Sequence, residues 1–442
     1  MLVMKFGGSS LANPQRIRNA CEIIKSRLKK KPIVVLSALG KTTDNLLSAG
    51  NDALGGKVHI RQIRDFHLGL AKELKADKKE VESLLSELEN LLKGISLTKG
   101  LTPETEDFLV SFGERLAVRI VAGYLNSTGI KVKHFDAWDA GFLSDSNFMN
   151  AKLKNETYAA VRRKFAHLKK KYKYTPIVTG FIAKDEDGNI TTLGRGGSDL
   201  TASVIGSAIK ADAIEIWKDV DGLLTTDPRM VKKARHVRKV SFEEASELAY
   251  FGAKIFHPYS ILPAMSANVP VIVKNYFKPR EEGTIVLKKF KNKSSELTGI
   301  SFKRNIVVVD IYSTRMLGQS GFVSKVFEQF GDLDISIDLI ATSEVDIAVT
   351  VGQSEKLNEL EKRFSGFGKI RIWKKMASIS LVGDIRNGKN ILKRAFIALS
   401  RIHVFPEMIS HGASQVSTSI VVDDKNLEKC VRVLHKEFLE HK

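Results

Sequence analysis

Residues 1–8, MLVMKFGG, decide how the rest of the chain is interpreted. The apolar run at 2–4 is long enough for a buried strand, Lys5 lies near its end, and Gly7 and Gly8 follow. Adjacent glycines let backbone N–H groups approach an anion closely, and a helix starting after them adds partial positive charge. The stretch predicts a strand, a glycine loop and a helix, with a lysine placed to hold a phosphoryl group. The spacing is not that of a Walker A loop, and an ordinary strand-to-helix connection has the same pattern.

Length and composition limit the class of protein. At 442 residues with 43% hydrophobic residues, the chain is long enough for two or three domains with sizeable cores. No apolar run approaches ~20 residues and the N-terminus lacks a signal pattern, so we expect no membrane span. Cys21 and Cys430 have no motif around them, which argues against a disulfide framework or a zinc site and predicts a cytoplasmic location.

The charge is strongly basic, with a net charge of +20. Lysine and arginine gather at 25–31, 162–173, 229–239 and 288–304. Such runs occur in nucleic-acid-binding proteins, but also on solvated helix faces and loops. No zinc-finger, helix-turn-helix or RNP pattern accompanies them, so we expect no specific nucleic-acid partner.

Further strands and loops suggest a ligand-binding sheet edge. Residues 32–38 form a continuous β-branched run, typical of a parallel strand covered on both faces, and the polar loop 40–45 follows it. In open α/β sheets, ligands bind at such carboxyl-end loops.

The helix expected over 102–125 contains SFGE at 111–114, whose internal glycine costs about 1 kcal/mol of helix stability relative to alanine. Close approach of a backbone or a ligand would justify that glycine.

A second glycine-rich loop, LGRGGSD at 193–199, leads directly into a helical run. Arg195 suits a bidentate grip on a carboxylate or phosphate. Asp199 falls in the first turn of the helix, where an acid often only complements the helix dipole. After the strand at 213–217, polar turns at 218–222 and 225–229 suit a nucleotide's base and ribose.

The C-terminal part contains two similar small units. Residues 306–374 predict a βαββαβ order, which is a ferredoxin-like arrangement. Residues 377–438 predict βαββα, so the last strand of this second unit is missing. We infer that the strand at 297–302 supplies it, which would insert the first unit within the second.

Motifs along nearly the whole chain resemble those of the aspartokinases. They are KFGGSS at 5–10, SFGE at 111–114, GRGGSD at 194–199, TTDPR at 225–229, and AK at 253–254 with HP at 257–258. The two small units resemble the tandem ACT domains of that family.

This resemblance implies an α/β amino-acid-kinase fold, an αβα sandwich with a mostly parallel open sheet, followed by two ferredoxin-like ACT units. The implied domains are 1–280 for the kinase, 306–375 for the first ACT domain, and 295–304 with 376–442 for the second. The implied activity is ATP-dependent phosphorylation of the L-aspartate side chain to 4-phospho-L-aspartate. That reaction is the first step of lysine/diaminopimelate, methionine and threonine biosynthesis.

A carboxylate acceptor is already an anion, so catalysis needs positioning and positive charge rather than a general base. We expect Lys5 to bridge the phosphates, Gly7 and Gly8 to donate backbone hydrogen bonds, and Asp199 to hold Lys5. By resemblance, Arg195 grips the aspartate α-carboxylate and Glu114 receives its α-ammonium. The same site would include Ser37, Ser198 and Thr43, with Thr42 as the alternative to Thr43.

By resemblance, the nucleotide site falls at Lys218, Asp219, Leu224, Arg229 and Lys254. The family often has threonine in place of Lys218 and tyrosine in place of Leu224. Mg²⁺ should arrive with ATP, held mainly by phosphate oxygens, and we expect no metal site built by the protein.

The first ACT unit resembles the effector site of lysine-inhibited members. The implied residues are Met316, Gln319, Gly321, Phe322, Val323, Ile337, Asp338, Ser343 and Glu344. Asp338 and Glu344 suit the cationic groups of lysine, although both also fit as solvated acids at strand ends. We expect lysine to inhibit, with threonine as the alternative effector, at an ACT–ACT interface of a homodimer or tetramer.

Two other functions remain open from the sequence. One is a glutamate or acetylglutamate kinase of the same fold, which the tandem ACT units and the motif at 111–114 disfavour. The other is an inactive ACT-type amino-acid sensor whose basic surface binds nucleic acid. Intact Lys5, Glu114, Arg195 and Asp199 argue against that sensor.

Overall fold

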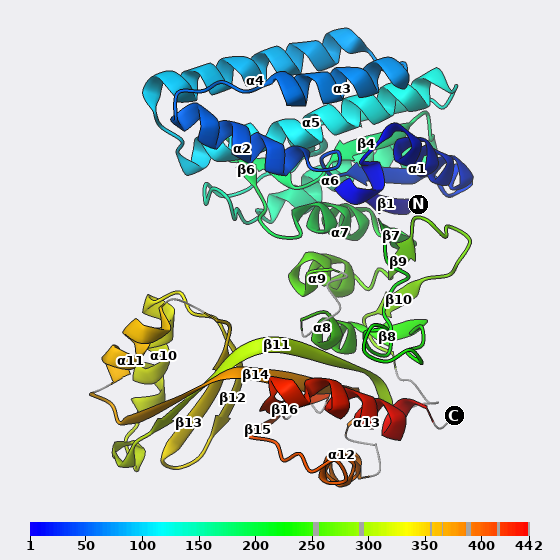
Figure 1. Ribbon diagram of the computed structural model, residues 1–442. Helices are drawn as coiled ribbons and strands as arrows, with labels where there is room; N and C mark the ends of the chain where they lie inside the picture. Colours follow the sequence, from blue (N-terminus) through cyan, green and yellow to red (C-terminus); the bar gives the residue numbers. More distant parts are fainter. Residues whose placement is uncertain are drawn as a thin grey trace. The chain divides into compact units, whose positions relative to one another are not determined.

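The computed structural model describes residues 1–250, 256–290, 296–353, 356–364, 366–385, 390–412 and 416–440. It divides into two compact units (Figure 1), one made of Met1–Gly222 with Ile255–Lys289 and the other of Leu223–Lys254 with Phe290–Lys442. Within the described ranges, no helix is both long and apolar enough to cross a membrane.

The first unit is built on a mostly parallel sheet with the strand order β3-β4-β2-β1-β7-β9-β10. Parallel ladders join β1 to β2 and β7, β4 to β2 and β3, and β7 to β9, while β10 runs antiparallel to β9. The strands are β1 Leu2–Phe6, β2 Pro32–Leu36, β3 Val132–Phe135, β4 Thr175–Thr179, β7 Ala213–Lys218, β9 Val271–Asn275 and β10 Thr284–Leu287. A small hairpin, β5 Ile182–Lys184 and β6 Ile190–Thr192, stands beside the sheet. The parallel sheet confirms the predicted fold class.

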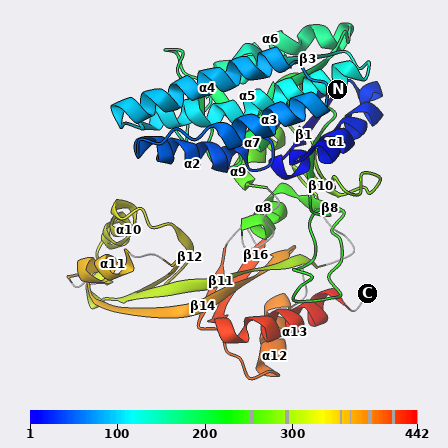
Figure 2. The ribbon, with the colours of Figure 1, turned by 45° about the horizontal axis from the view of Figure 1, so that its top comes forward.

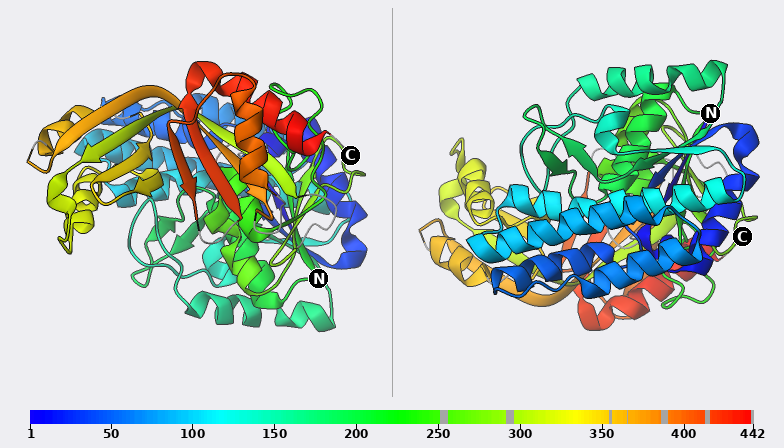
Figure 3. Two further views of the ribbon diagram at one scale, coloured as in Figure 1. Left: turned by 90° about the horizontal axis from the view of Figure 1, so that it is seen from below. Right: turned by 90° about the horizontal axis from the view of Figure 1, so that it is seen from above.

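Helices cover both faces of this sheet, which makes the predicted sandwich. Figure 1 and the right-hand view of Figure 3 show α2–α5 as one blue and cyan layer, with α5 against β2, β3 and β4. The other face carries α7, which packs on β1, β2 and β7 and is flanked by α6 and α9. The helices are α1 Pro14–Ser26, α2 Thr42–Leu54, α3 Arg61–Glu73, α4 Lys78–Thr98, α5 Pro103–Ser127, α6 Glu156–Lys170, α7 Gly197–Ile209 and α9 Pro258–Ser266, with single 3₁₀ turns at Gly8–Leu11, Leu28–Lys30 and Ala137–Ala140.

Local sequence explains the central elements. Every residue of β1 is buried, as its apolar run predicted, and the Phe6 ring stacks on Trp217 of β7 with centroids 6.0 Å apart. Helix α5 begins at Pro103, and the side chain of Thr102 caps it by accepting the N–H of Thr105. The expected close approach at Gly113 is present, because an added Cβ there would lie 2.7 Å from the Cβ of Ala38.

The second unit contains one antiparallel sheet with the order β12-β13-β11-β14-β16-β15. Its strands are β11 Leu297–Tyr312, β12 Ile337–Thr342, β13 Asp346–Val351, β14 Lys369–Gly383, β15 Met408–His411 and β16 Ser417–Asp423; the short strand β8 Lys239–Ser241 also belongs to this unit. The sequence predicted two strands where β11 stands and two where β14 stands, and the structure has one of each. Asn305 and Lys375 take left-handed conformations near the register shifts, so the chain bulges there without turning.

The predicted completion of the second ferredoxin-like unit is confirmed. The first part of β11 pairs with β14 from Leu297 opposite Gly383 to Lys303 opposite Ser378. The later part of β11 pairs with the other half of β14 and with β13. The two ferredoxin-like units therefore share their two longest strands.

Two helix pairs complete this unit (Figure 2): α10 Phe322–Asp332 with α11 Leu357–Phe364, and α12 Ile391–Ser400 with α13 Leu427–Leu439. Single 3₁₀ turns stand at Thr314–Met316 and Asp424–Asn426. The left-hand view of Figure 3 shows α12 and α13 side by side in orange and red. The unit also contains α8 Phe242–Tyr250, from a segment that the sequence placed in the kinase domain 1–280. The domain limits 1–280, 306–375 and 295–304 with 376–442 stay predictions.

Candidate active site

Lys5, at the end of β1, and Asp199, in the first turn of α7, form a buried ion pair with 2.6 Å between Nζ and Oδ1. The other oxygen of Asp199 lies 3.0 Å from Nζ of Lys218, at the end of β7. Because β1 and β7 are parallel neighbours, their last residues reach the same edge of the sheet. The sequence predicted that Asp199 holds Lys5, and the structure brings the two together.

Burial and charge act against each other in this cluster. Burial lowers the pKa of Lys5, and the nearby Asp199 opposes that shift. Burial also works to raise the pKa of Asp199, but Lys5 and Lys218 outweigh it and hold the pKa below its ordinary value. Asp199 therefore remains a carboxylate that orients two ammonium groups.

The glycine loop after β1 fits tightly against the loop after β2. The N–H of Gly40 donates to the carbonyl of Gly8 over 3.1 Å, and Gly40 is left-handed at φ 57°. An added Cβ on Gly8 would meet the carbonyl oxygen of Ala38 at 2.8 Å. An added Cβ on Gly7 would face Nζ of Lys5 at 3.8 Å, so this glycine keeps open the space beside the ammonium group.

Glu114, inside α5, is buried against the turn after β2. Its Oε1 accepts the N–H of Ala38 over 3.0 Å, while its Oε2 is buried with no hydrogen-bond partner in the described structure. Burial raises the pKa of Glu114 to about 8. A buried carboxyl oxygen without a partner suits an ammonium ligand, since an unpaired buried polar atom is costly.

Serine hydroxyls meet at the same edge. Oγ of Ser37 donates to Oγ of Ser198 over 3.0 Å, which joins the end of β2 to the start of α7. Gly180, just after β4, lies close beside them, because an added Cβ would fall 2.7 Å from Oγ of Ser198. The sequence gave Gly180 no role, because a single strand was predicted over 175–182, whereas β4 ends at Thr179 and Gly180 follows it.

The remaining predicted substrate residues differ in exposure. Arg195 is exposed, between the left-handed Gly194 and Gly196. Thr42 is buried, and its hydroxyl donates to the carbonyl of Leu39 over 2.6 Å and lies 3.2 Å from Nε2 of His67. Thr43 is only partly buried. The hydroxyl of Thr42 is thus bonded within the fold, and the assignment of Thr43 as a substrate ligand stays a prediction.

Comparison with known proteins identifies the family to which this chain belongs. Residues 1–275 match the amino acid kinase family and residues 379–438 match an ACT domain. The chain is 44% identical to aspartokinase 1, chloroplastic, of Arabidopsis thaliana, over 99% of this chain and 80% of that protein. It is 30% identical to lysine-sensitive aspartokinase 3 of Escherichia coli, over 100% of this chain and 99% of that one.

The chain belongs to the aspartokinase family. Its fold also superposes on the crystal structure of E. coli aspartokinase III in complex with aspartate and ADP, with a TM-score of 0.81 and 29% identity over 99% of each chain. The chain is therefore an aspartate kinase, which transfers phosphate from ATP to aspartate.

In this aspartokinase the predicted nucleotide residues divide between the two compact units. Lys218 and the exposed Asp219 belong to the first unit, beside the Lys5 cluster. Leu224 and Arg229 belong to the second unit, where Arg229 is exposed and binds Asp227 with 2.7 Å between Nη2 and Oδ2. Lys254 lies outside the described residues.

The predicted effector residues of the aspartokinase lie at two ends of one strand. The segment before α10 contains Met316, Gln319 and Gly321, and α10 begins with Phe322 and Val323. This segment adjoins the turn with Ser343 and Glu344, since the N–H of Ser313 donates to the carbonyl of Val345 over 2.8 Å. Ile337 and Asp338 begin β12 at its opposite end, and roughly 13 Å of strand separates Asp338 from Thr342. Asp338 already binds Nζ of Lys303 at 2.5 Å. The predicted effector residues therefore form two groups, one at each end of β12.

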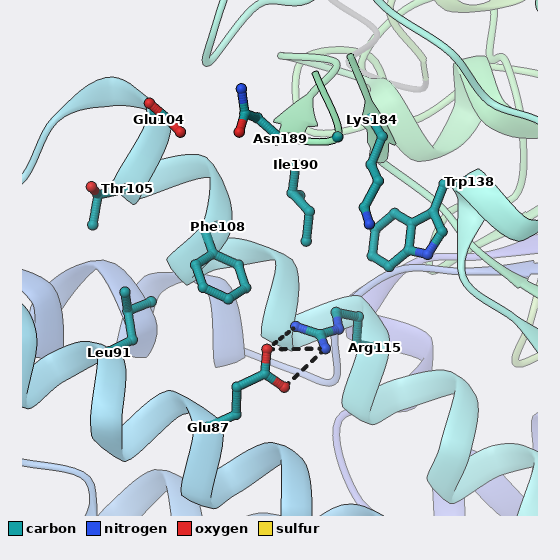
Figure 4. Close-up of a pocket in the computed structure, with 11 residues that line it drawn as sticks. Glu87, Leu91, Glu104, Thr105, Phe108, Arg115, Trp138, Lys184, Asn189 and Ile190 are labelled. Atoms are coloured by element: carbon teal, nitrogen blue, oxygen red, sulfur yellow. Dashed lines mark hydrogen bonds and ion pairs between the residues drawn. The ribbon is translucent and has the colours of Figure 1, made fainter. Parts of the chain in front are cut away.

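A separate pocket of the kinase unit contains none of the predicted site residues (Figure 4). It has a volume of about 410 Å³ and lies between α4, α5 and the β5–β6 hairpin. Arg115, the neighbour of Glu114, lines it and pairs with Glu87 at 3.1 Å, while Lys184 lies over the Trp138 ring. Successive residues of α5 thus face different surroundings.

Proposed function

We propose that Lys5 neutralises the transferring phosphoryl group while aspartate's side-chain oxygen attacks it. A bond forms between that oxygen and the γ-phosphorus, the bond to the β–γ bridging oxygen breaks, and ADP leaves; no proton moves. The observation that carries this proposal is the buried Lys5–Asp199 pair at the carboxyl edge of the sheet. Asp199 keeps the ammonium group in position, Gly7 leaves open the space beside it, and the N–H groups of Gly7 and Gly8 would donate to phosphate oxygens.

Aspartate is proposed to bind through its α-groups. Arg195 takes the α-carboxylate from its exposed loop, and Glu114 takes the α-ammonium with the oxygen that has no partner in the described structure. Ser37, Thr43 and Ser198 supply hydroxyls between them. The reacting carboxylate then points toward Lys5, so the lysine is the charge that lets two anions meet.

Mg²⁺ is proposed to enter with ATP. Among the described residues, no group of three or more His, Cys, Asp or Glu side chains could hold a metal ion, so ligands would come chiefly from phosphate oxygens. Bound there, the ion would neutralise phosphate charge. Lys218, Asp219, Leu224, Arg229 and Lys254 are the proposed nucleotide contacts of the chain itself.

Lysine is proposed to inhibit through the first ACT unit. The structure of E. coli aspartokinase III with lysine and aspartate gives a TM-score of 0.82 with this chain at 29% identity. The E. coli relative that is 30% identical to this chain is named lysine-sensitive aspartokinase 3. Because the effector residues fall at opposite ends of β12, we propose that two protomers complete each lysine site, which requires at least a homodimer.

The product, 4-phospho-L-aspartate, would supply the synthesis of lysine, methionine and threonine.

The protein is proposed to be located in the cytoplasm. Cys21 and Cys430 are both buried free thiols, which fits a reducing compartment.

A hydroxamate assay for acyl phosphate tests the activity and its regulation together. Aspartate with MgATP should give hydroxamate, glutamate should give little, and millimolar lysine should suppress the signal more than threonine does. Failure to form acyl phosphate from aspartate would refute the kinase function. Activity that is unchanged by lysine would refute only the regulation.

A further inference from the structure

The loop of residues 223–237 contains the TTDPR motif and lies within the segment that matches the amino acid kinase family. In the structure it nevertheless folds with the C-terminal unit. Met230 and Val231 of this loop share a hydrophobic core with Val431 and Leu434 of α13. A motif of the kinase family is therefore part of the compact unit that contains the two ferredoxin-like units.

Thr225 is held firmly in this loop, because its backbone N–H, its carbonyl and its hydroxyl are all bonded within the unit. Its N–H donates to the carbonyl of Arg235 over 2.8 Å, and its carbonyl accepts the N–H of Ile300 over 2.7 Å. Its hydroxyl accepts the N–H of Arg235 over 2.9 Å and lies 3.0 Å from Nε2 of His435. Since the hydroxyl already accepts from Arg235, its own hydrogen is available to His435.

His435 is completely buried in α13. Its Nδ1 lies 3.1 Å from Oε1 of Glu440, whose other oxygen pairs with Nζ of Lys233 at 2.9 Å. A carboxylate only accepts, so Nδ1 carries the proton and Nε2 accepts from Thr225. Burial lowers the pKa of His435, in keeping with a neutral ring. The chain of hydrogen bonds thus starts and ends on the same loop.

We propose that His435 is a positioning residue for ATP: through Thr225 it holds the loop in the conformation that presents Leu224 and Arg229 to the nucleotide. The proposal rests on the proposed function, which assigns those two residues to ATP. Leu224 precedes Thr225 directly and forms an isolated bridge with His236, so a shift of Thr225 moves Leu224 as well. Arg432 adds a second tie from α13, with its Nε donating to the carbonyl of Met230 over 3.1 Å.

The test is His435→Leu in the full chain, which removes both ring hydrogen bonds at similar volume. We expect the KM for ATP to rise about tenfold, as loss of a buried hydrogen-bond network predicts. The KM for aspartate and kcat at saturating ATP should stay within about twofold. His435→Gln, whose carbonyl can still accept from Thr225, should restore the ATP constant. Lys436→Gln, at an exposed position of the same helix, is the matched control and should change neither constant.

Thr225→Val and Thr225→Ser keep the test decisive if His435→Leu does not fold. The valine variant should reproduce the ATP-specific rise, and the serine variant should not. Equal increases in both KM values, or unchanged ATP binding in His435→Leu and Thr225→Val, would overturn the positioning role. Failure of the nucleotide assignment itself looks different, because Arg229→Ala would then leave the KM for ATP unchanged.

Discussion

Nζ of Lys5 lies 2.6 Å from Oδ1 of Asp199, and the two residues are separated by almost two hundred positions in the chain. If this pair orients the catalytic charge, Lys5→Ala should lower kcat by about 10²-fold or more, the scale found when one electrostatic stabiliser of a transition state is removed. Asp199 keeps Lys218 as a partner, so the variant should still fold. Steady-state kinetics with circular dichroism checks both points. A folded variant within tenfold of wild-type kcat would contradict the role.

Arg195→Ala should raise the KM for aspartate and spare the KM for ATP, because the proposed ligand of Arg195 is the α-carboxylate. Loss of a charged hydrogen bond of about 1.5–3 kcal/mol corresponds to a rise of about 10- to 100-fold. Arg229→Ala is the matched variant, since it also removes one exposed arginine but should affect only ATP. Reversed effects would exchange the two assignments.

The affinity for aspartate should depend on pH through Glu114, whose pKa is raised to about 8 by burial. The group is largely neutral below that pH and must lose its proton to receive an ammonium ion. The KM for aspartate should therefore fall as pH rises from about 6 to 8, approaching tenfold per unit at the acid end. Glu114→Gln should have a higher KM with a flatter profile. A wild-type KM independent of pH in this range would argue against Glu114 as the ammonium ligand.

Gly113→Ala should destabilise the protein and weaken aspartate binding. The added methyl would lie 2.7 Å from Cβ of Ala38, whose N–H donates to Glu114, and overpacking of this kind costs about 1–3 kcal/mol. Gly94→Ala in α4 is the control, because its added methyl meets nothing within 4 Å and should stabilise by about 0.5–1 kcal/mol. Chemical denaturation and the KM for aspartate report both effects. Equal stability changes in the two variants would contradict the packing argument.

Much of the active site could be predicted because its residues sit where short motifs meet strand ends and helix starts. Lys5 lies near the end of a buried strand and Asp199 lies in the first turn of a helix, so both were expected at one edge of a parallel sheet. The link from Lys218 to Asp199 could not be predicted, since a lysine at a strand end gives no sign of its partner's position. The sequence does not distinguish Thr42 from Thr43, because the buried His67 that lies beside Thr42 is 25 positions away in the chain.

The C-terminal strands show a second limit on what the sequence alone can predict. Residues at 297–302 and 306–312 read as separate strands because polar residues interrupt the pattern between them, yet backbone pairing with β14 continues past that interruption. Likewise, nothing local in the TTDPR segment indicates that it packs with α13. That arrangement depends on His435 and Leu434, about two hundred residues away.

The shared ladder of β11 and β14 has a consequence for any attempt to dissect regulation genetically. A truncation that ends before β14 leaves residues 297–303 of β11 without a strand partner and exposes the edge of residues 306–312. Variants that escape the proposed feedback by lysine should therefore be point substitutions or short in-frame changes at loops, and such truncations should give insoluble protein instead of a deregulated enzyme.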